Sequence, residues 1–297
     1  MPPDSRENRS AGILWMLATM LCFITLDAIM KHLLESYSLV QVTWARFFFA
    51  TLVAAAVCGP RIGNLAISRQ PKLQALRSVL LMTTTAMFNA GIRTTPLATA
   101  TTIMFLSPIL VTILAIPLLG EKVRLRRWIG VIFGFAGALV VVRPWEIGLG
   151  GMGAGALFLL AAALLNANYQ IITRKVRNDD PLTSLLYTAA AGAVVSSLIV
   201  PWFWTWPTGF DWLLLIASGI AGGVGHLFLI RAFRAAPASV VAPFSYSSLL
   251  WAAIFGFVIW KDWPDLWTWG GAALIIGSGL YIFQRERKTG VTVDSRR

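Results

Sequence analysis

Long apolar runs, separated by short polar or Gly- and Pro-containing turns, recur along the whole chain. Ten of them can be delimited, at about 11–32, 39–59, 74–94, 96–119, 125–143, 150–173, 182–204, 210–230, 237–260 and 264–284. A helix needs roughly 20 apolar residues to cross a bilayer. A transmembrane strand would instead alternate apolar and polar residues over ~10-residue segments, and none of the runs does so. The pattern predicts an all-α membrane protein with ten transmembrane helices.

The stretch from Pro96 to Gly137 returns 141 residues further along the chain. Its residue pairs are Arg93 and Arg234, Pro96 and Pro237, Glu121 and Asp262, Trp128 and Trp269, and Gly130 and Gly271. A fixed offset that holds across two apolar runs and their loop indicates an internal repeat. Five helices per copy is an odd number, so the second copy enters the membrane from the opposite side. We therefore predict two inverted five-helix repeats, which is an architecture of alternating-access carriers.

The chain is therefore expected to divide into a cytoplasmic tail at residues 1–10, a first repeat at 11–143, a second repeat at 150–284 and a basic cytoplasmic tail at 285–297. With the N-terminus inside, twenty Lys and Arg residues fall in inner segments and four in outer ones. This bias is the positive-inside rule, so the formal net charge of +12 reflects topology rather than nucleic-acid binding. We expect both termini in the cytoplasm and a multi-pass protein of the bacterial inner (plasma) membrane, surrounded by lipid.

Ionisable residues within the apolar runs are the first functional candidates, because a charge at the centre of a membrane helix costs about 2.5–3.5 kcal/mol and normally faces an interior cavity. Asp27 and Arg46 are such residues. They can form a structural pair, or Asp27 can sense protons or a substrate amine while Arg46 binds a carboxylate. His226 titrates near physiological pH when unperturbed and would suit proton coupling, with a hydrogen-bonded packing role as the alternative. We assign these three residues to coupling or gating.

Polar and aromatic residues within the runs are the candidates for substrate binding. Asn166 and Tyr169 share a helix face at a spacing of three, and the repeat alignment places Asn168 opposite Asp27. Large rings with a polar tip commonly line ligand pockets. The predicted substrate-binding residues are Met82, Thr85, Asn89, Asn166, Asn168, Tyr169, Tyr246 and Trp251. Helix–helix hydrogen bonding and packing against lipid remain the alternatives for this set.

The motifs of the repeated stretch resemble those of a known family. The pattern Pro96-Leu-Ala, Leu106-Ser107-Pro108, Leu119-Gly120-Glu121-Lys122 and Trp128-Ile129-Gly130 is similar to the EamA repeat of the drug/metabolite transporter superfamily. The second copy matches more loosely, with Leu249 in place of Pro108 and Asp262 in place of Glu121. Within that superfamily the chain looks most like the YddG-type amino-acid exporters. The resemblance implies export of small metabolites through a central cavity lined mainly by the first, third and fourth helices of each repeat.

Together these observations predict a secondary transporter that exports amino acids, aromatic or otherwise neutral, or similar small metabolites by alternating access. An exporter of cationic drugs and an importer of another metabolite remain open as alternatives. An intramembrane enzyme is disfavoured because the chain has two histidines and lacks the GxSxG and HExxH motifs and any metal-ligand cluster. We expect no cofactor, no metal and no nucleic-acid partner. The oligomeric state is open and is compatible with a monomer.

Overall fold

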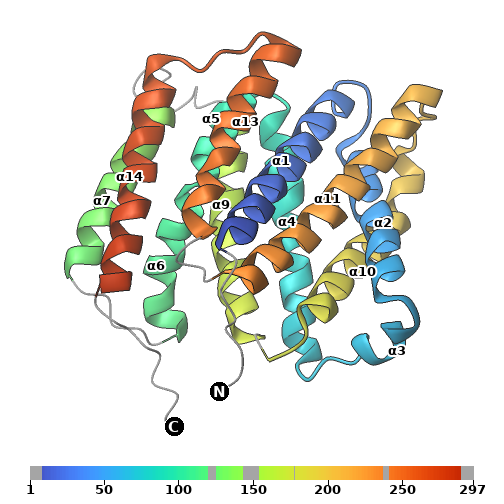
Figure 1. Ribbon diagram of the computed structural model, residues 1–297. Coiled ribbons are helices and arrows are strands. Elements are labelled where there is room, and N and C mark those ends of the chain that lie inside the picture. The colour runs from blue at the N-terminus through green and yellow to red at the C-terminus, as the bar shows by residue number, and fades with distance from the viewer. Residues whose placement is uncertain (1–8, 120–124, 143–153, 177, 237–240, 289–297) are drawn as a thin grey trace.

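Figure 1 shows the computed structural model of the chain, which describes residues 9–119, 125–142, 154–176, 178–236 and 241–288. All regular secondary structure in these ranges is helical. The predictions made for Glu121 and Pro237, and for most of the two tails, fall outside the described residues.

Helices lie over each of the predicted apolar runs. The first half of the chain contains α1 (Arg9–Leu33), α2 (Leu39–Cys58), a 3-10 turn η1 (Gly59–Arg61), α3 (Ile62–Leu65), α4 (Pro71–Ile92), α5 (Leu97–Met104), α6 (Leu106–Leu119) and α7 (Leu125–Val142). The second half contains α9 (Ala154–Lys175), α10 (Pro181–Ile199), η2 (Val200–Phe203), α11 (Gly209–Ala235), η3 (Ala242–Tyr246), α13 (Ser247–Phe255), a π-helical turn η4 (Gly256–Trp260) and α14 (Leu266–Lys288).

Seven helical segments among the described residues are long and apolar enough to cross a membrane. Shorter apolar helices lie at Ile132–Val141 and Leu266–Ser278. The protein is thus an all-helical membrane protein, and its ten crossings and inverted orientation stay predictions.

Side-chain caps fix where two helices begin. The Ser38 hydroxyl accepts a hydrogen bond from the amide of Gln41 at 3.2 Å in front of α2. Asp180 accepts from the amide of Leu182 at 2.8 Å in front of α10. Such caps satisfy N–H groups that have no partner inside the helix. Pro181 follows at the first helical position, where its missing N–H is not needed.

The fourth apolar run is not one continuous helix. It is divided at Phe105, between α5 and α6. Pro108 explains the break, because a proline cannot donate to the carbonyl four residues earlier, here that of Met104, and its ring clashes with that carbonyl. At the end of α5 the amide of Phe105 is shared between the carbonyls of Thr101 and Thr102, at 3.3 and 3.1 Å. Pro96, the first residue of the fourth apolar run, is the N-cap residue of α5 and lies just outside the helix.

Pairs of helices from the two halves of the chain form most of the packing. In Figure 1, α7 and α14 stand side by side at one edge, while α1 lies against α11 and α4 against α9. The α7–α14 contact is close because two glycines meet. A methyl group built on Gly137 would lie 2.8 Å from the carbonyl oxygen of Gly271, and one built on Gly271 would lie 2.6 Å from that of Gly137. Small residues of this kind let membrane helices approach each other closely.

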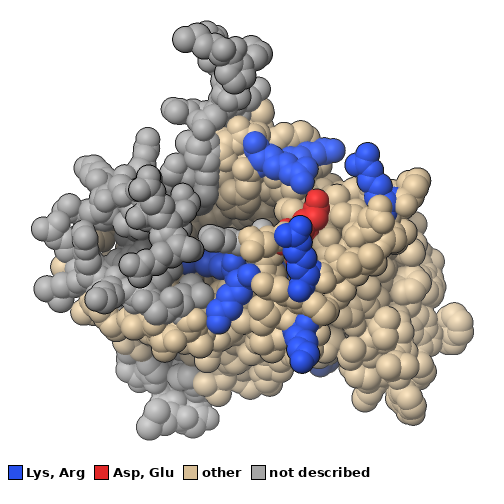
Figure 2. Space-filling view, turned by 90° about the horizontal axis from the view of Figure 1, so that it is seen from below, with Lys and Arg blue, Asp and Glu red and all other residues tan. Residues whose placement is uncertain are grey.

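Charge is distributed unequally between the two ends of the bundle. Figure 2 shows the end where α4 and α10 begin and α9 and α11 end, with Lys and Arg side chains gathered on it. Exposed basic residues of the described chain at this end are Arg61, Arg69, Lys72, Arg174, Lys175, Arg231 and Arg234. The asymmetry agrees with the sequence-based assignment of this end to the cytoplasm, which remains a prediction. We call it the basic end, and the other the opposite end.

Candidate functional site

A small cavity lies between helices of both halves of the chain, nearer the basic end. Its lining comes from α2 and α4 of the first half and α9, α10 and α11 of the second: Arg46, Phe47, Ala50, Arg77, Leu81, Tyr169, Leu185, Thr188, Ala189, Gly222, Gly223 and His226. The cavity has a volume of about 30 Å³. That is room for a few water molecules and far below the ~300–1,000 Å³ of pockets that hold small ligands. A solute larger than a single functional group therefore requires these helices to move apart.

Arg77 is the most extensively bonded side chain of the cavity wall. Its Nε donates to the hydroxyl of Thr173 at 2.8 Å, and its Nη2 donates to the hydroxyl of Tyr169 at 2.6 Å. Its Nη1 donates to the carbonyl of Ser184 at 2.8 Å and to the hydroxyl of Thr188 at 2.6 Å. All four acceptors are neutral and come from α9 and α10. Arg77 thus joins α4 of the first half to two helices of the second, and its charge has no carboxylate partner in the described chain.

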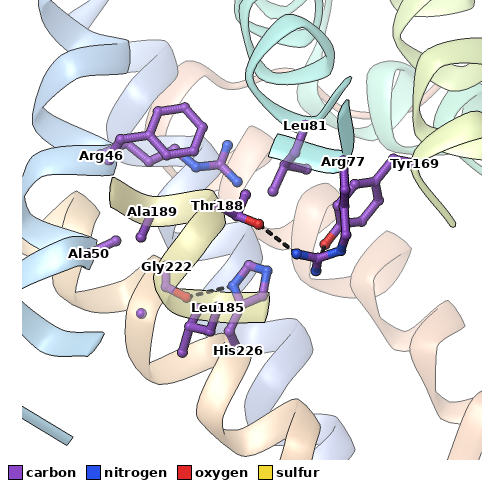
Figure 3. A pocket seen from close by; sticks show the side chains of 12 residues that line it. Arg46, Ala50, Arg77, Leu81, Tyr169, Leu185, Thr188, Ala189, Gly222 and His226 are labelled. Atoms are coloured by element: carbon purple, nitrogen blue, oxygen red, sulfur yellow. Dashed lines mark hydrogen bonds between the residues drawn. The ribbon is translucent and has the colours of Figure 1, made fainter. Parts of the chain in front are cut away.

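Arg46 differs from Arg77 in its surroundings. It extends from α2 into the cavity, with its guanidinium pointing between Leu81 and Thr188 (Figure 3). The half-buried Arg46 stands 5.7 Å from the ring centroid of Phe47, and no hydrogen bond or ion pair of Arg46 is found in the described part of the chain. Asp27 of α1 interacts with it electrostatically, but no contact within 4 Å joins their charged atoms. Arg46 and Asp27 are therefore opposite charges without a direct contact in the structure.

His226 of α11 completes this side of the cavity. Its Nδ1 lies 2.9 Å from the carbonyl oxygen of Gly222, one turn earlier in the same helix (Figure 3). A carbonyl only accepts hydrogen bonds, so Nδ1 carries a hydrogen and, in the neutral ring, Nε2 is an acceptor. The ring also packs edge-on against Phe23 at 5.0 Å. These contacts agree with the hydrogen-bonded packing alternative for His226, and its assignment to coupling or gating stays a prediction.

A polar cluster around Asp179 joins two loops at the basic end. Its carboxylate, in the α9–α10 connection, accepts from the hydroxyl of Ser68, from the amide of Arg69 at 3.1 Å and from the side chain of Gln74 at 2.9 Å. Burial alone would raise the pKa of Asp179, but these hydrogen bonds to its charged form outweigh that effect and hold the pKa below its usual value. The cluster ties the loop before α4 to the loop before α10.

A second cluster of polar contacts joins the two halves of the chain at the opposite end. The hydroxyl of Tyr37, just before α2, donates to the carboxylate of Asp211 at 2.6 Å and accepts from the amide of Thr208 at 3.3 Å. Nearby, Nζ of Lys31 stands 3.7 Å from Asp262 and 4.8 Å from the ring of Trp260. Both ends of the bundle are thus tied across the two halves.

Only three of the sequence-predicted residues line this cavity: Arg46, Tyr169 and His226. The amide of Asn168 donates to the carbonyl of Leu164 in its own helix at 2.9 Å. Asn89 is fully buried and donates to the hydroxyl of Thr43 at 3.1 Å. The other predicted residues outside the cavity lining are Met82, Thr85, Asn166, Tyr246, Trp251 and the half-buried Asp27. Their assignment to substrate binding or coupling stays a prediction.

Sequence reasoning missed Arg77 and Thr188. Arg77 lies inside the third apolar run, expected at about 74–94, but it was counted with the inner basic residues at 61–77 and was not weighed as a site residue. In the structure α4 begins at Pro71, which places Arg77 well inside the helix. The available signal was Pro71 itself, since proline favours the first helical position. The family resemblance implied a cavity lined mainly by the first, third and fourth helices of each repeat. This cavity instead receives nothing from α1, α5, α6 or α13, and it is lined in part by the second helices, α2 and α10.

Comparison with known proteins decides the class of this protein. The sequence profile of the EamA-like transporter family matches residues 10–143 and 153–284. The chain belongs to the EamA-like transporter family. Its members named below are transporters, in agreement with the expectation that the chain is not an enzyme.

Several characterised relatives align over nearly the whole chain. The S-adenosylmethionine uptake transporter of Rickettsia felis is 30% identical over 96% of this chain and 96% of its own. The riboflavin transporter of Vibrio cholerae is 27% identical over 93% of this chain and 94% of its own. The pseudopaline exporter CntI of Pseudomonas aeruginosa is 26% identical over 90% and 93%. These names do not support the finer resemblance to amino-acid exporters, which stays a prediction.

A protein of known crystal structure shares the fold. It superposes with a TM-score of 0.66 over 95% of this chain and 99% of its own, at 20% sequence identity.

Proposed function

We propose that this protein is a secondary transporter of small metabolites that carry an α-amino-acid group, and that the solute binds beside Arg46 between the two halves. The observation that carries the proposal is the unpaired state of Arg46 among the described residues at a cavity lined by both halves. Charged groups inside a membrane protein are costly, and they commonly mark a substrate or ion pathway.

An α-amino-acid group is complementary to this arrangement. Its carboxylate would bind the guanidinium of Arg46, and its ammonium would lie toward Asp27, whose charge acts on Arg46 without direct contact. Placing the zwitterion between the two would give each charge a partner that it lacks in the described chain. A purely cationic drug suits the site less well, because two guanidinium groups, those of Arg46 and Arg77, line the cavity.

The pattern of helix pairs supports alternating access by two inverted repeats. In such a repeat α1, α2, α4, α5–α6 and α7 correspond in order to α9, α10, α11, α13 and α14. Helices α1 and α11 are in contact, and so are their counterparts α9 and α4. The same holds for α2–α11 with α10–α4, and for α1–α13 with α9–α5. A two-fold axis between residues 11–143 and 150–284 would produce this reciprocity. Such an axis lies in the membrane plane in carriers with inverted repeats.

We further propose that both termini face the cytoplasm of a bacterial inner membrane, in line with the basic end of the bundle. The chain contains no Walker-type glycine loop, so flux follows the gradient of the solute or of a coupled ion. The same transport cycle can then export or take up a solute, depending on the direction of that gradient. The names of the relatives include both directions.

Counterflow in proteoliposomes tests this function. The protein is reconstituted and exchange is followed for labelled L-methionine, L-phenylalanine, S-adenosylmethionine and riboflavin. We expect saturable exchange of at least one compound with an α-amino-acid group, and a loss of tenfold or more in Arg46→Gln. Arg231→Gln is the matched control, because Arg231 is an exposed residue at the basic end. Exchange of riboflavin alone, or equal activity of the two variants, would contradict the proposal.

A further inference from the structure

The hydroxyl of Tyr169 has an unused hydrogen. A phenol has one hydrogen to donate and can also accept, and this oxygen accepts from Nη2 of Arg77 at 2.6 Å. Its hydrogen must therefore point elsewhere, and no acceptor for it is found in the described chain. The hydroxyl of Thr188, which also accepts from Arg77, is different because it donates to the carbonyl of Ser184 at 2.8 Å. Tyr169 is thus left as a donor in the wall of the cavity.

Arg77 holds this donor in place. The guanidinium lies 4.7 Å from the ring centroid of Tyr169 as well as bonding to its hydroxyl, and the Arg77 side chain is only 6% exposed. A cation that donates to a hydroxyl oxygen polarises it and strengthens the hydrogen bond that the hydroxyl itself can give. Four of the five N–H groups of Arg77 are engaged by α9 and α10, so we assign to Arg77 the role of holding the Tyr169 hydroxyl in place.

Arg46 supplies a second donor group to the same space. Figure 3 shows its guanidinium directed into the cavity from the side opposite Arg77 and Tyr169. Arg46 and Tyr169 both line the cavity, and the two guanidinium groups of the lining are balanced by no carboxylate within it. Two convergent donors in a positively charged cavity match an oxyanion. Charge-assisted hydrogen bonds to oxyanions are among the strongest in proteins.

We infer that an oxyanion of the transported solute, a carboxylate or a phosphate, binds between the guanidinium of Arg46 and the hydroxyl of Tyr169, with Arg77 as the positioning residue of that hydroxyl. This inference rests on the proposed transport function and specifies which atoms select the solute. The present cavity has a volume of only about 30 Å³, so the solute enters when the helices separate.

Paired ligands that differ by one acidic group test the inference. Binding to the purified protein is measured by calorimetry with S-adenosylmethionine and its decarboxylated form, with L-methionine and L-methioninamide, and with flavin mononucleotide and riboflavin. We expect the acidic member of at least one pair to bind tenfold or more tightly than its partner. The first two pairs report a carboxylate, and the third reports a phosphate.

Variants then assign the effect to the two side chains. Tyr169→Phe removes one hydrogen bond to a charged group, and we expect binding of the acidic ligand to weaken by about tenfold to a hundredfold, with its partner unchanged. Arg77→Lys, which loses the fork that bonds Tyr169, should show the same selective loss. Tyr187→Phe is the control, because the Tyr187 hydroxyl donates to the carbonyl of Ala66 at 2.9 Å outside the cavity.

The outcomes separate the inference from the function on which it rests. Equal binding of both members of every pair, or a Tyr169→Phe loss that is the same for both members, overturns the oxyanion site even if counterflow is active. Selective binding that depends on Tyr169, without counterflow of any of these compounds, supports the site and overturns the carrier. Neither binding nor counterflow with any compound overturns both.

Discussion

Gly219 lies where α11 packs against α2, and its replacement by alanine should destabilise the protein through a steric clash. A methyl group built on Gly219 would lie 2.2 Å from Cβ of Phe49, 2.9 Å from its carbonyl carbon and 2.9 Å from the amide nitrogen of Ala50. Two of these three atoms belong to the backbone of α2, so no rotation of a side chain relieves the clash. The two helices must separate for the variant to fold.

Two opposing terms set the magnitude. Alanine is about 0.8–1 kcal/mol more favourable than glycine within a helix, whereas overpacking a well-packed site costs about 1–3 kcal/mol. Because the Gly219 contact involves backbone atoms at very short distance, its cost lies at the upper end of that range, and we expect a net destabilisation of about 2 kcal/mol. Gly222→Ala is the matched control one turn later, where the nearest atom is Cδ2 of Leu26 at an ordinary 3.4 Å. It should be neutral or up to about 1 kcal/mol more stable.

Unfolding of the two purified variants in one detergent, followed by tryptophan fluorescence, measures the difference. We expect Gly219→Ala to unfold at a lower denaturant concentration than the wild type, and Gly222→Ala at an equal or higher one. Equal stability of the two variants would refute the reasoning. It would mean either that α2 moves away from α11 at little cost or that the two helices do not approach each other this closely.

Three further predictions concern the site and the two ends of the bundle. The hydrogen bonds of Asp179 lower its pKa in the folded protein. Its contribution to stability is therefore present above the unfolded pKa of ~3.9 and is lost as the pH falls through the lower folded pKa. Asp179→Asn should reduce thermal stability at pH 7, and its difference from the wild type should shrink toward pH 3. Arg46→Met should keep the elution profile of the wild type in gel filtration while counterflow falls at least tenfold, and a fully active variant would remove Arg46 from the site. Lys31→Met removes both the 3.7 Å ion pair with Asp262 and the 3.0 Å hydrogen bond to the carbonyl of Thr95. It should increase the labelling rate of a cysteine placed at Thr95 by a membrane-impermeant thiol reagent, an increase that Lys31→Arg, which keeps a charged donor, should not show.

The positions of the helices could be predicted because they depend on local properties of the chain. The second apolar run was expected at 39–59, and α2 occupies Leu39–Cys58. The eighth was expected to stop at 230, yet α11 continues to Ala235. Its last turn contains Arg234, and a basic residue there ends an apolar run but favours the C-terminal end of a helix dipole. Hydropathy thus marks the apolar part of a helix rather than its hydrogen-bonded length.

The site was harder to predict because it depends on the rotation of each helix about its own axis. Asn168 is polar and in an apolar run, like Tyr169, but its amide bonds within α9 while the tyrosine reaches Arg77. The sequence offers no means to distinguish these adjacent positions. Arg77 could have been placed in a helix from Pro71, but its four acceptors lie about 100 residues further along the chain. Contacts at that separation follow from tertiary packing alone.

The clusters at the two ends of the bundle occupy corresponding positions in the two halves. Tyr37 directly precedes Ser38, the cap of α2, and Asp179 directly precedes Asp180, the cap of α10. Each contacts the segment at the start of the third helix of the other half, Tyr37 at Thr208 before α11 and Asp179 at the loop before α4. A carrier that alternates between two open states needs those states to be close in free energy, since a ligand shifts the equilibrium only by its differential affinity. In the proposed inverted repeat, the duplicated sequence would keep the two states close in free energy. Each half contributes one such cluster, and the two clusters lie at opposite ends of the bundle. Opening either end would then break a comparable set of hydrogen bonds.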